Sequence, residues 1–243
     1  MKKELLGAAA LLAVVAPGIA HADTGGSVRL TYAGADSDAD KNGVIALGGV
    51  VVSDLSVDHW RVQLNGSTVD TDQYGTSYAY GQAEVHAVYD AGQFQFGGFT
   101  GISNTNGYGW WEYGVEAAMN FDRGHIALSA AGATSPYTSY DNISSYAAEG
   151  SFSLTDDLHV GATLSTTDFG NYGSGDSINS WGLNVGYNIP DTHFSVGVGY
   201  RSSDDANSTK FFGVSLVWNF GDGAAGRVMP GASALVPDAI VDQ

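Results

Sequence analysis

The sequence contains no cysteine. Small secreted domains are often stapled by disulfides, so another kind of interaction must hold this chain if it is exported. Proline is scarce, at 5 residues, whereas glycine reaches 34. Basic residues are few as well: Lys and Arg total 9 against 26 Asp and Glu, for a formal net charge of −17. Since phosphate binding requires clustered Lys and Arg, nucleic acid is a poor partner for such a chain.

Residues 1–22 have the features of a secretory signal peptide. Two lysines form a basic start, an apolar run extends from Leu5 to Ala16, and small residues precede a predicted cleavage site before Asp23. The run is shorter than the ~18 residues that would span a membrane. We therefore expect this segment to be removed on export. No apolar stretch of ~20 residues follows it, which excludes a membrane helix but not a membrane protein.

A strand signature recurs along the rest of the chain. In SWGLNVGYNI, residues 180–189, apolar side chains occupy every second position from Trp181 to Ile189. This period of two predicts a β-strand with one apolar and one polar face, whereas a helix needs apolar residues three and four apart. Twelve strands are predicted, near 26–34, 43–53, 57–68, 77–89, 93–103, 109–121, 124–134, 143–154, 157–167, 178–189, 193–202 and 210–220.

The predicted connections alternate in length. Long ones follow the odd-numbered strands, and short ones such as DLS, DAG and DR follow the even-numbered strands. Outer-membrane barrels have short periplasmic turns and long external loops, whereas a soluble sandwich has no reason to sort its loops in this way. Because backbone groups in lipid must be bonded internally, such a sheet must close on itself. A secreted β-sandwich or β-helix with an aromatic core is the alternative.

Aromatic residues on the apolar faces fall into two bands. Barrels in the outer membrane carry such bands at both interfaces with water. One band lies at the short-turn ends: Trp60, Tyr89, Phe94, Phe121, Phe152, Tyr187, Phe194 and Phe220. The other lies at the long-loop ends: Tyr32, Tyr113, Tyr146, Trp181, Tyr200 and Phe212.

With these features, residues 26–220 resemble Gram-negative outer-membrane β-barrels of the porin type. The last predicted strand, FFGVSLVWNF, is similar to the aromatic-ended final strand that the barrel-assembly machinery recognises. The resemblance implies a bacterial outer-membrane location and lipid and lipopolysaccharide as surroundings. One departure is the Gly- and Ala-rich tail 221–243, because such proteins often end at the final Phe. We expect a disordered periplasmic tail, with a plug or partner-docking segment as the alternative.

The polar faces should line the lumen. Charged and histidine side chains on this parity are the candidate lumen-lining residues: Arg29, His59, Arg61, Glu84, His86, Glu112, Glu116, Glu149, His159, His193 and Arg201. The sequence contains no G-x-S-x-G, H-E-x-x-H or P-loop string. We therefore predict no catalytic residue, no cofactor and no enzyme. A lipid-modifying barrel enzyme, which would need a lipid-facing Ser–His pair, is a minor alternative.

The acidic stretch ADSDADKNG, residues 35–43, begins as a calcium loop begins. The EF-hand pattern requires Gly at the sixth position and Glu at the twelfth, where this chain has Lys41 and Leu47. We therefore predict no dedicated metal site. Acidic residues of the external loops should act together and attract cations, with plain solubility as the alternative: Asp36, Asp38, Asp40, Asp70, Asp72, Asp204 and Asp205.

Five histidines should lie near the periplasmic mouth: His59, His86, His125, His159 and His193. His suits an interface, and a sharper hypothesis is a ring sensitive to protons or metal. If the hairpin that contains residues 57–89 folds symmetrically about residues 72 and 73, His59 faces His86 and Arg61 faces Glu84 in a salt bridge.

These patterns together predict an all-β fold: a transmembrane, antiparallel, up-and-down barrel of about twelve strands over residues 23–220, with both termini periplasmic. A barrel of this size should have a narrow or partly plugged lumen. The predicted function is passive diffusion of small hydrophilic solutes with a preference for cations. A structural or surface-interaction barrel without an open pore is the second hypothesis. Neither the solute nor the oligomeric state follows from the sequence.

Overall fold

The structure is a computed structural model that describes residues 24–36, 41–55, 57–73, 76–105, 108–134, 143–168, 177–204 and 209–221. The strands of its first half are β1 (Thr24–Asp36), β2 (Lys41–Asp54), β3 (Trp60–Gln73), β4 (Thr76–Ala91), β5 (Phe94–Thr105) and β6 (Tyr108–Phe121). Those of its second half are β7 (Gly124–Thr134), β8 (Ile143–Ser153), β9 (Leu158–Asp168), β10 (Ser177–Asn188), β11 (Phe194–Ser203) and β12 (Lys210–Phe220).

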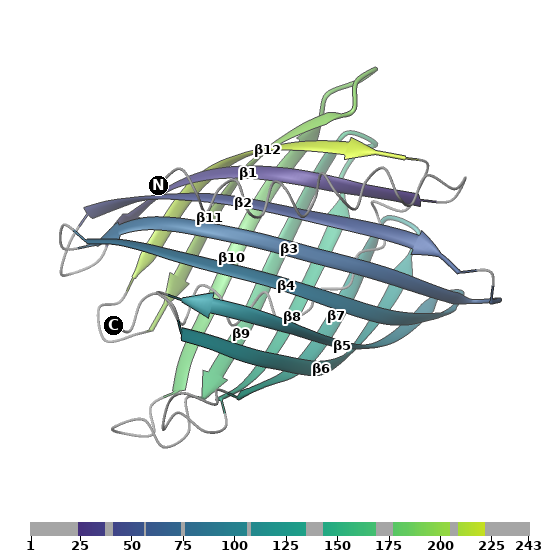
Figure 1. Ribbon diagram of the computed structural model, residues 1–243. Coiled ribbons are helices and arrows are strands. Elements are labelled where there is room, and N and C mark those ends of the chain that lie inside the picture. Colours follow the sequence, from purple (N-terminus) through teal and green to yellow (C-terminus); the bar gives the residue numbers. More distant parts are fainter. Residues whose placement is uncertain are drawn as a thin grey trace.

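Each strand pairs with its neighbours in sequence, and β12 pairs with β1 to close a barrel (Figure 1). All pairs are antiparallel, and the closing pair runs from Gly26 opposite Phe220 to Asp36 opposite Lys210. In Figure 1, β1–β6 cross in front and β7–β11 lie behind them. The predicted all-β, twelve-stranded, up-and-down barrel is confirmed. No helix among the described residues is both long and apolar enough to cross a membrane.

The outer surface of the barrel is apolar because the strands alternate as the sequence indicated. On β10, Leu183 is 55% exposed on the outer face, while its inward neighbour Gly182 is buried. On β12, Phe212 is 61% exposed. Nearly all of the predicted band residues are among the exposed large hydrophobic side chains, including Trp60 and Tyr89, whose rings pack edge to face at 5.4 Å. A continuous apolar outer surface of this kind suits hydrocarbon rather than water.

The lengths of the connections at the two ends of the barrel differ from the predicted lengths. We call the end where β1 begins and β12 ends the turn end, and the opposite end the loop end. Turns 92–93 and 122–123 lie at the turn end, and residues 135–142 separate β7 from β8 in the sequence. However, only residues 74–75 and 106–107 separate β3 from β4 and β5 from β6.

The predicted sorting by loop length is therefore only partly correct. The first six strands have 12 to 16 residues and the last six have 10 to 12. In the β3–β4 hairpin the ladder continues to Gln73 opposite Thr76, so Asp70 and Asp72 belong to β3 and not to a loop. The reason is local, because Thr, Val and Tyr around these acids favour extended pairing.

The predicted register of the same hairpin is wrong. Arg61 lies opposite Val88, and Glu84 lies opposite Asn65. The partner of Arg61 is thus four residues further along β4 than predicted, since the hairpin turns at 74–75 instead of 72–73. A shift by an even number of residues leaves every side chain on its predicted face, but it removes the proposed Arg61–Glu84 bridge and the His59–His86 pair.

Candidate functional site

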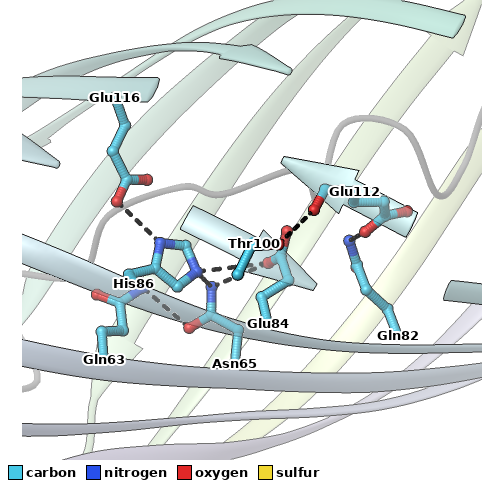
Figure 2. Close-up of polar contacts among 8 residues, drawn as sticks. All are labelled: Gln63, Asn65, Gln82, Glu84, His86, Thr100, Glu112 and Glu116. Carbon is cyan, nitrogen blue, oxygen red and sulfur yellow. Dashed lines mark hydrogen bonds and ion pairs between the residues drawn. The ribbon is translucent and has the colours of Figure 1, made fainter. Parts of the chain in front are cut away.

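The inward faces of the strands form two different walls. We call the inward side chains of β3–β6 the filled wall and those of β9–β12 the open wall. The filled wall is composed largely of long polar side chains, of which Figure 2 shows a group joined by hydrogen bonds. The open wall is composed largely of glycine and serine.

His86 lies at the centre of the filled wall and is completely buried, with 0% of its surface exposed. Its Nδ1 is 2.8 Å from Glu116 Oε1 on β6. Asn65 Nδ2 on β3 lies 2.9 Å from its Nε2 and also donates to Glu84 Oε2 at 3.3 Å (Figure 2). The imidazole stacks on the ring of Phe99 from β5, with centroids 5.2 Å apart. One side chain thus joins four neighbouring strands.

The same wall holds four buried carboxylates, those of Glu84, Asp90, Glu112 and Glu116. Glu112 is 2% exposed and accepts a hydrogen bond of 2.8 Å from Gln82 Nε2. Gln63 Nε2 donates to Asn65 Oδ1 at 2.9 Å and thereby orients the Asn65 amide toward His86 and Glu84. Buried carboxylates need such partners because water cannot solvate them.

Glycines on the filled wall make room for these side chains. A Cβ at Gly101 would lie 2.8 Å from Glu84 Cγ, and a Cβ at Gly97 would lie 2.7 Å from Glu116 Oε1. Both carboxylate side chains therefore lie along the wall, over glycines of β5, and do not project straight across the lumen. Without these glycines the cluster would have to move, because real Cβ atoms do not approach other atoms this closely.

At the turn end, Arg61 lies between two carboxylates. Its Nε is 2.6 Å from Asp54 on β2, and one of its terminal nitrogens is 2.7 Å from Asp90 on β4. Asp90 also accepts a hydrogen bond from the backbone nitrogen of Gly92 at 2.8 Å. Arg61 therefore joins three strands at the turn end, in place of the predicted contact with Glu84.

The open wall presents a polar surface on which many inward positions carry no side chain. Its inward glycines are Gly161, Gly182, Gly186, Gly197, Gly199 and Gly213. Arg201 on β11 donates to Ser180 Oγ at 2.7 Å and to Ser165 Oγ at 3.2 Å, so its guanidinium lies along the neighbouring strands.

The inner surface of the barrel is accessible on this side. Arg29 of β1, Thr163 of β9 and Asn184 of β10 are inward and exposed within their strands, and Asn188 is exposed where β10 ends at the turn end. Asp54 of β2 is also inward and exposed, at the turn end. The Glu149 side chain of β8 is also 31% exposed and lies 3.5 Å from His125. By contrast, every inward side chain of β4 from Tyr80 to Asp90 is buried.

The predicted histidines do not form a ring. His86, His125 and His159 lie on inward strand positions, and His125 Nδ1 is 2.8 Å from Ser151 Oγ. His59 and His193 instead lie exposed in the turns before β3 and β11. His59 has a left-handed backbone, with φ of 67°, and its ring packs at 5.9 Å on the outward-facing Tyr89. The turn breaks the strand alternation, so its side chain does not follow the inward parity.

The described members of the predicted set of external acids lie at or near the loop end. Asp36 ends β1, Asp70 and Asp72 lie in β3, and Asp204 follows β11. Asp204 Oδ2 accepts a hydrogen bond of 2.8 Å from the Asn179 side chain. Asp38, Asp40 and Asp205 lie outside the described residues, as do the predicted signal peptide and all but the first residue of the predicted tail. Within the described ranges no three His, Asp or Glu side chains are grouped as metal ligands.

Charge was the criterion for the predicted site, and it missed uncharged lumen residues. Asn65 connects His86 with Glu84, and Thr163, Asn184 and Asn188 are open to water. All of them have the inward parity that identified the charged residues. The sequence does not show how far the side chains of other strands cover each inward residue, and this coverage decides which inward residues are exposed.

No protein-family model and no curated protein sequence matches the chain. Solved structures do. The chain is similar to the KdgM porin in complex with disordered oligogalacturonate, with a TM-score of 0.54 and 10% identity, covering 79% of this chain and 99% of that one. It is also similar to the translocator domain of the autotransporter NalP from Neisseria meningitidis, with a TM-score of 0.51 and 10% identity, covering 90% and 99%.

A third similar structure is the Pseudomonas putida toluene transporter TodX, with a TM-score of 0.50 and 8% identity, covering 82% of this chain and 89% of that one. Identities this low establish the fold alone. The chain therefore has the fold of porin-type outer-membrane β-barrels, and the resemblance inferred from the sequence is confirmed at that level.

Proposed function

We propose that this protein is an outer-membrane channel for the passive diffusion of small hydrophilic solutes. The observation that carries the proposal is the exposure of Arg29, Thr163, Asn184 and Asn188 on the inner surface of a closed barrel. Water inside a barrel with an apolar exterior is the condition for solute passage across a bilayer. The porin fold of the structural neighbours supports the same function.

The location follows from the same proposal. Residues 1–22 direct export and are cleaved, and the apolar outer surface contacts outer-membrane lipid, with lipopolysaccharide at the loop end. The barrel-assembly machinery recognises the last strand, where Leu216 and Trp218 face outward and are exposed. No enzymatic activity and no cofactor are proposed.

We further propose a preference for cations. Glu84, Glu112 and Glu116 place three carboxylates on the filled wall, where their hydrogen-bond partners include the Asn65 and Gln82 amides and the His86 imidazole. Arg201 on β11 lies across the barrel from the filled wall and opposes the field of these carboxylates, as does Arg29 on β1, which only β2 separates from β3. A lumen lined by charge of one sign raises the local concentration of the opposite ion. KdgM was solved with an acidic oligosaccharide, a solute that this acidic wall disfavours.

A planar bilayer recording tests both levels of the proposal. Purified protein should produce discrete conductance steps, and a KCl gradient should give a reversal potential with the sign of a cation-selective channel. An anion-selective reversal potential would reject the cation preference and leave the channel intact. The absence of conductance from correctly folded barrels would reject the channel itself.

The second candidate is a structural or surface-interaction barrel without an open pore. Apolar side chains also occupy the lumen: Val88 packs with Ala118 and Ala127, and Phe99 packs with Ala133. If these clusters extend across the lumen in the membrane, the barrel is closed. Discrete conductance steps in a planar bilayer would support the channel, and their absence would support the closed barrel.

A further inference from the structure

We propose that solutes cross this barrel through one sector of its lumen, along the open wall, and that Thr163, Asn184 and Arg29 are the side chains that they contact. The inference rests on the proposed channel function and assigns its path. The acidic cluster of the filled wall then acts on solutes through its electric field and not by contact.

The filled wall leaves little accessible surface on the inner face of β4. All of its inward side chains between residues 80 and 90 are buried. What covers them is other protein: His86 is stacked on Phe99 and bonded to Glu116, and Gln82 is bonded to Glu112. A solute could reach these groups only by separating buried, hydrogen-bonded side chains, which is costly.

On the open wall, as on the filled wall, long side chains lie opposite glycines of neighbouring strands, but here Thr163 and Asn184 are exposed. Asn184 is opposite Gly161 on one side and Gly199 on the other. A Cβ at Gly161 would collide with the Asn184 carboxamide, so this side chain lies over the glycine. Asn184 is nevertheless an exposed residue.

Thr163 repeats this arrangement on the next strand. It is opposite Gly182, where a Cβ would lie 2.8 Å from Thr163 Oγ1. The surface of this sector is therefore formed by a single layer of side chains that lie on the backbone. It presents amide, hydroxyl and backbone groups. Neutral donors and acceptors of this kind can replace the water around small solutes that carry hydroxyl or amide groups. Arg29, exposed on β1 at the edge of this sector, is its accessible positive charge.

The absence of native cysteine makes a direct test possible, because any single introduced thiol is unique. Open-wall variants are Asn184→Cys and Thr163→Cys. Matched controls on buried inward positions are Ser103→Cys and Ser129→Cys, and Leu183→Cys reports the lipid-facing side. The probe is trimethylammonioethyl methanethiosulfonate, which reacts with a thiolate to form a mixed disulfide and releases methanesulfinate. Labelling is measured by mass spectrometry and current in a planar bilayer.

Open-wall thiols should be labelled in the folded barrel, and labelling should reduce the current about twofold or more. The two buried controls should stay unlabelled with unchanged current. Heat-modifiable migration in gels shows which variants have assembled.

Current that persists unchanged after complete labelling at Asn184→Cys and Thr163→Cys would reject the path and leave the channel function standing. Labelling and block at Ser103→Cys or Ser129→Cys would place the path at the other wall and also reject the inference. If unmodified, assembled protein carries no current, the channel function is rejected first and the path with it.

Discussion

The filled wall and the open wall are both built of antiparallel strands, but their inward side chains differ in size. On β4 of the filled wall the inward residues include Gln82, Glu84 and His86, whereas on β11 of the open wall they include Gly197 and Gly199. Both walls carry apolar side chains on the outside. The comparison shows that the volume of inward side chains, and not the number of strands alone, decides where a barrel of this size is open.

Two inward glycines, Gly101 of the filled wall and Gly199 of the open wall, differ in the space around them. At Gly101 of the filled wall there is no room for a side chain, because the position is covered by Glu84. At Gly199 of the open wall a Cβ would meet its nearest atoms at ordinary distances, 3.6 Å from the Leu183 carbonyl oxygen and 3.8 Å from Asn184 Cβ. The first glycine accommodates a neighbour, and the second leaves space in the lumen.

The largest expected effect comes from filling that space. Gly199→Trp should reduce single-channel conductance about fivefold or more, because an indole would project into the open sector from a wall that has room for its Cβ. Gly199→Ala, which adds one methyl group, should conduct as the unchanged protein does. A Gly199→Trp barrel with full conductance would show that solutes do not pass this wall.

The filled wall should instead determine stability. His86→Ala should lower the free energy of unfolding by about 3 kcal/mol, because it removes the partner of Glu116 and Asn65 from a buried network. Urea titration of the barrel folded in lipid vesicles measures this. The matched open-wall change, Asn184→Ala, should alter stability by no more than ~0.5 kcal/mol. Equal losses at both positions would contradict the distinction between the walls.

Alanine substitutions at one glycine of each wall compare the two walls again, with a smaller expected effect on stability. Gly101→Ala should destabilise the barrel by about 2 kcal/mol, since its Cβ would lie 2.5 Å from the Ala83 carbonyl oxygen and 2.8 Å from Glu84 Cγ. Gly199→Ala should be within ~0.5 kcal/mol of the unchanged protein. Unfolding in vesicles again gives the measurement, and a neutral Gly101→Ala would mean that Glu84 can move freely.

The smallest expected effect is on ion selectivity. Glu112→Gln should reduce, and Arg29→Gln should increase, the preference for cations, each by about twofold in the permeability ratio. Reversal potentials in a KCl gradient provide the readout, and both shifts should be larger at low salt because salt screens the charges. Shifts of the same sign would show that the charges of Glu112 and Arg29 do not act in opposition.

The strands themselves were predictable from the sequence. The predicted bounds of β7 and β12 are those of the structure, and the others differ by a few residues. Alternation is a local property, so a short window of residues shows it. The inward or outward orientation of Glu84, Glu112 and Glu116 followed from the same parity.

Registers and loops were less predictable. The β3–β4 pairing depended on where a single turn falls, and moving it from 72–73 to 74–75 changed every partner. His59 and His193 were assigned inward because the strand parity was extended into turns, where a backbone such as that of His59 breaks it. Both errors occur where the ladder of hydrogen bonds stops enforcing the alternation.

The sequence by itself determined the fold class, the two faces of each strand and the residue types on each. Only the tertiary structure decided that Glu84, His86 and Glu116 are buried together while Thr163 and Asn184 are open to water. The physical reason is that alternation depends on adjacent residues of one strand. Burial inside a barrel depends on the side chains of other strands, brought together by register and closure.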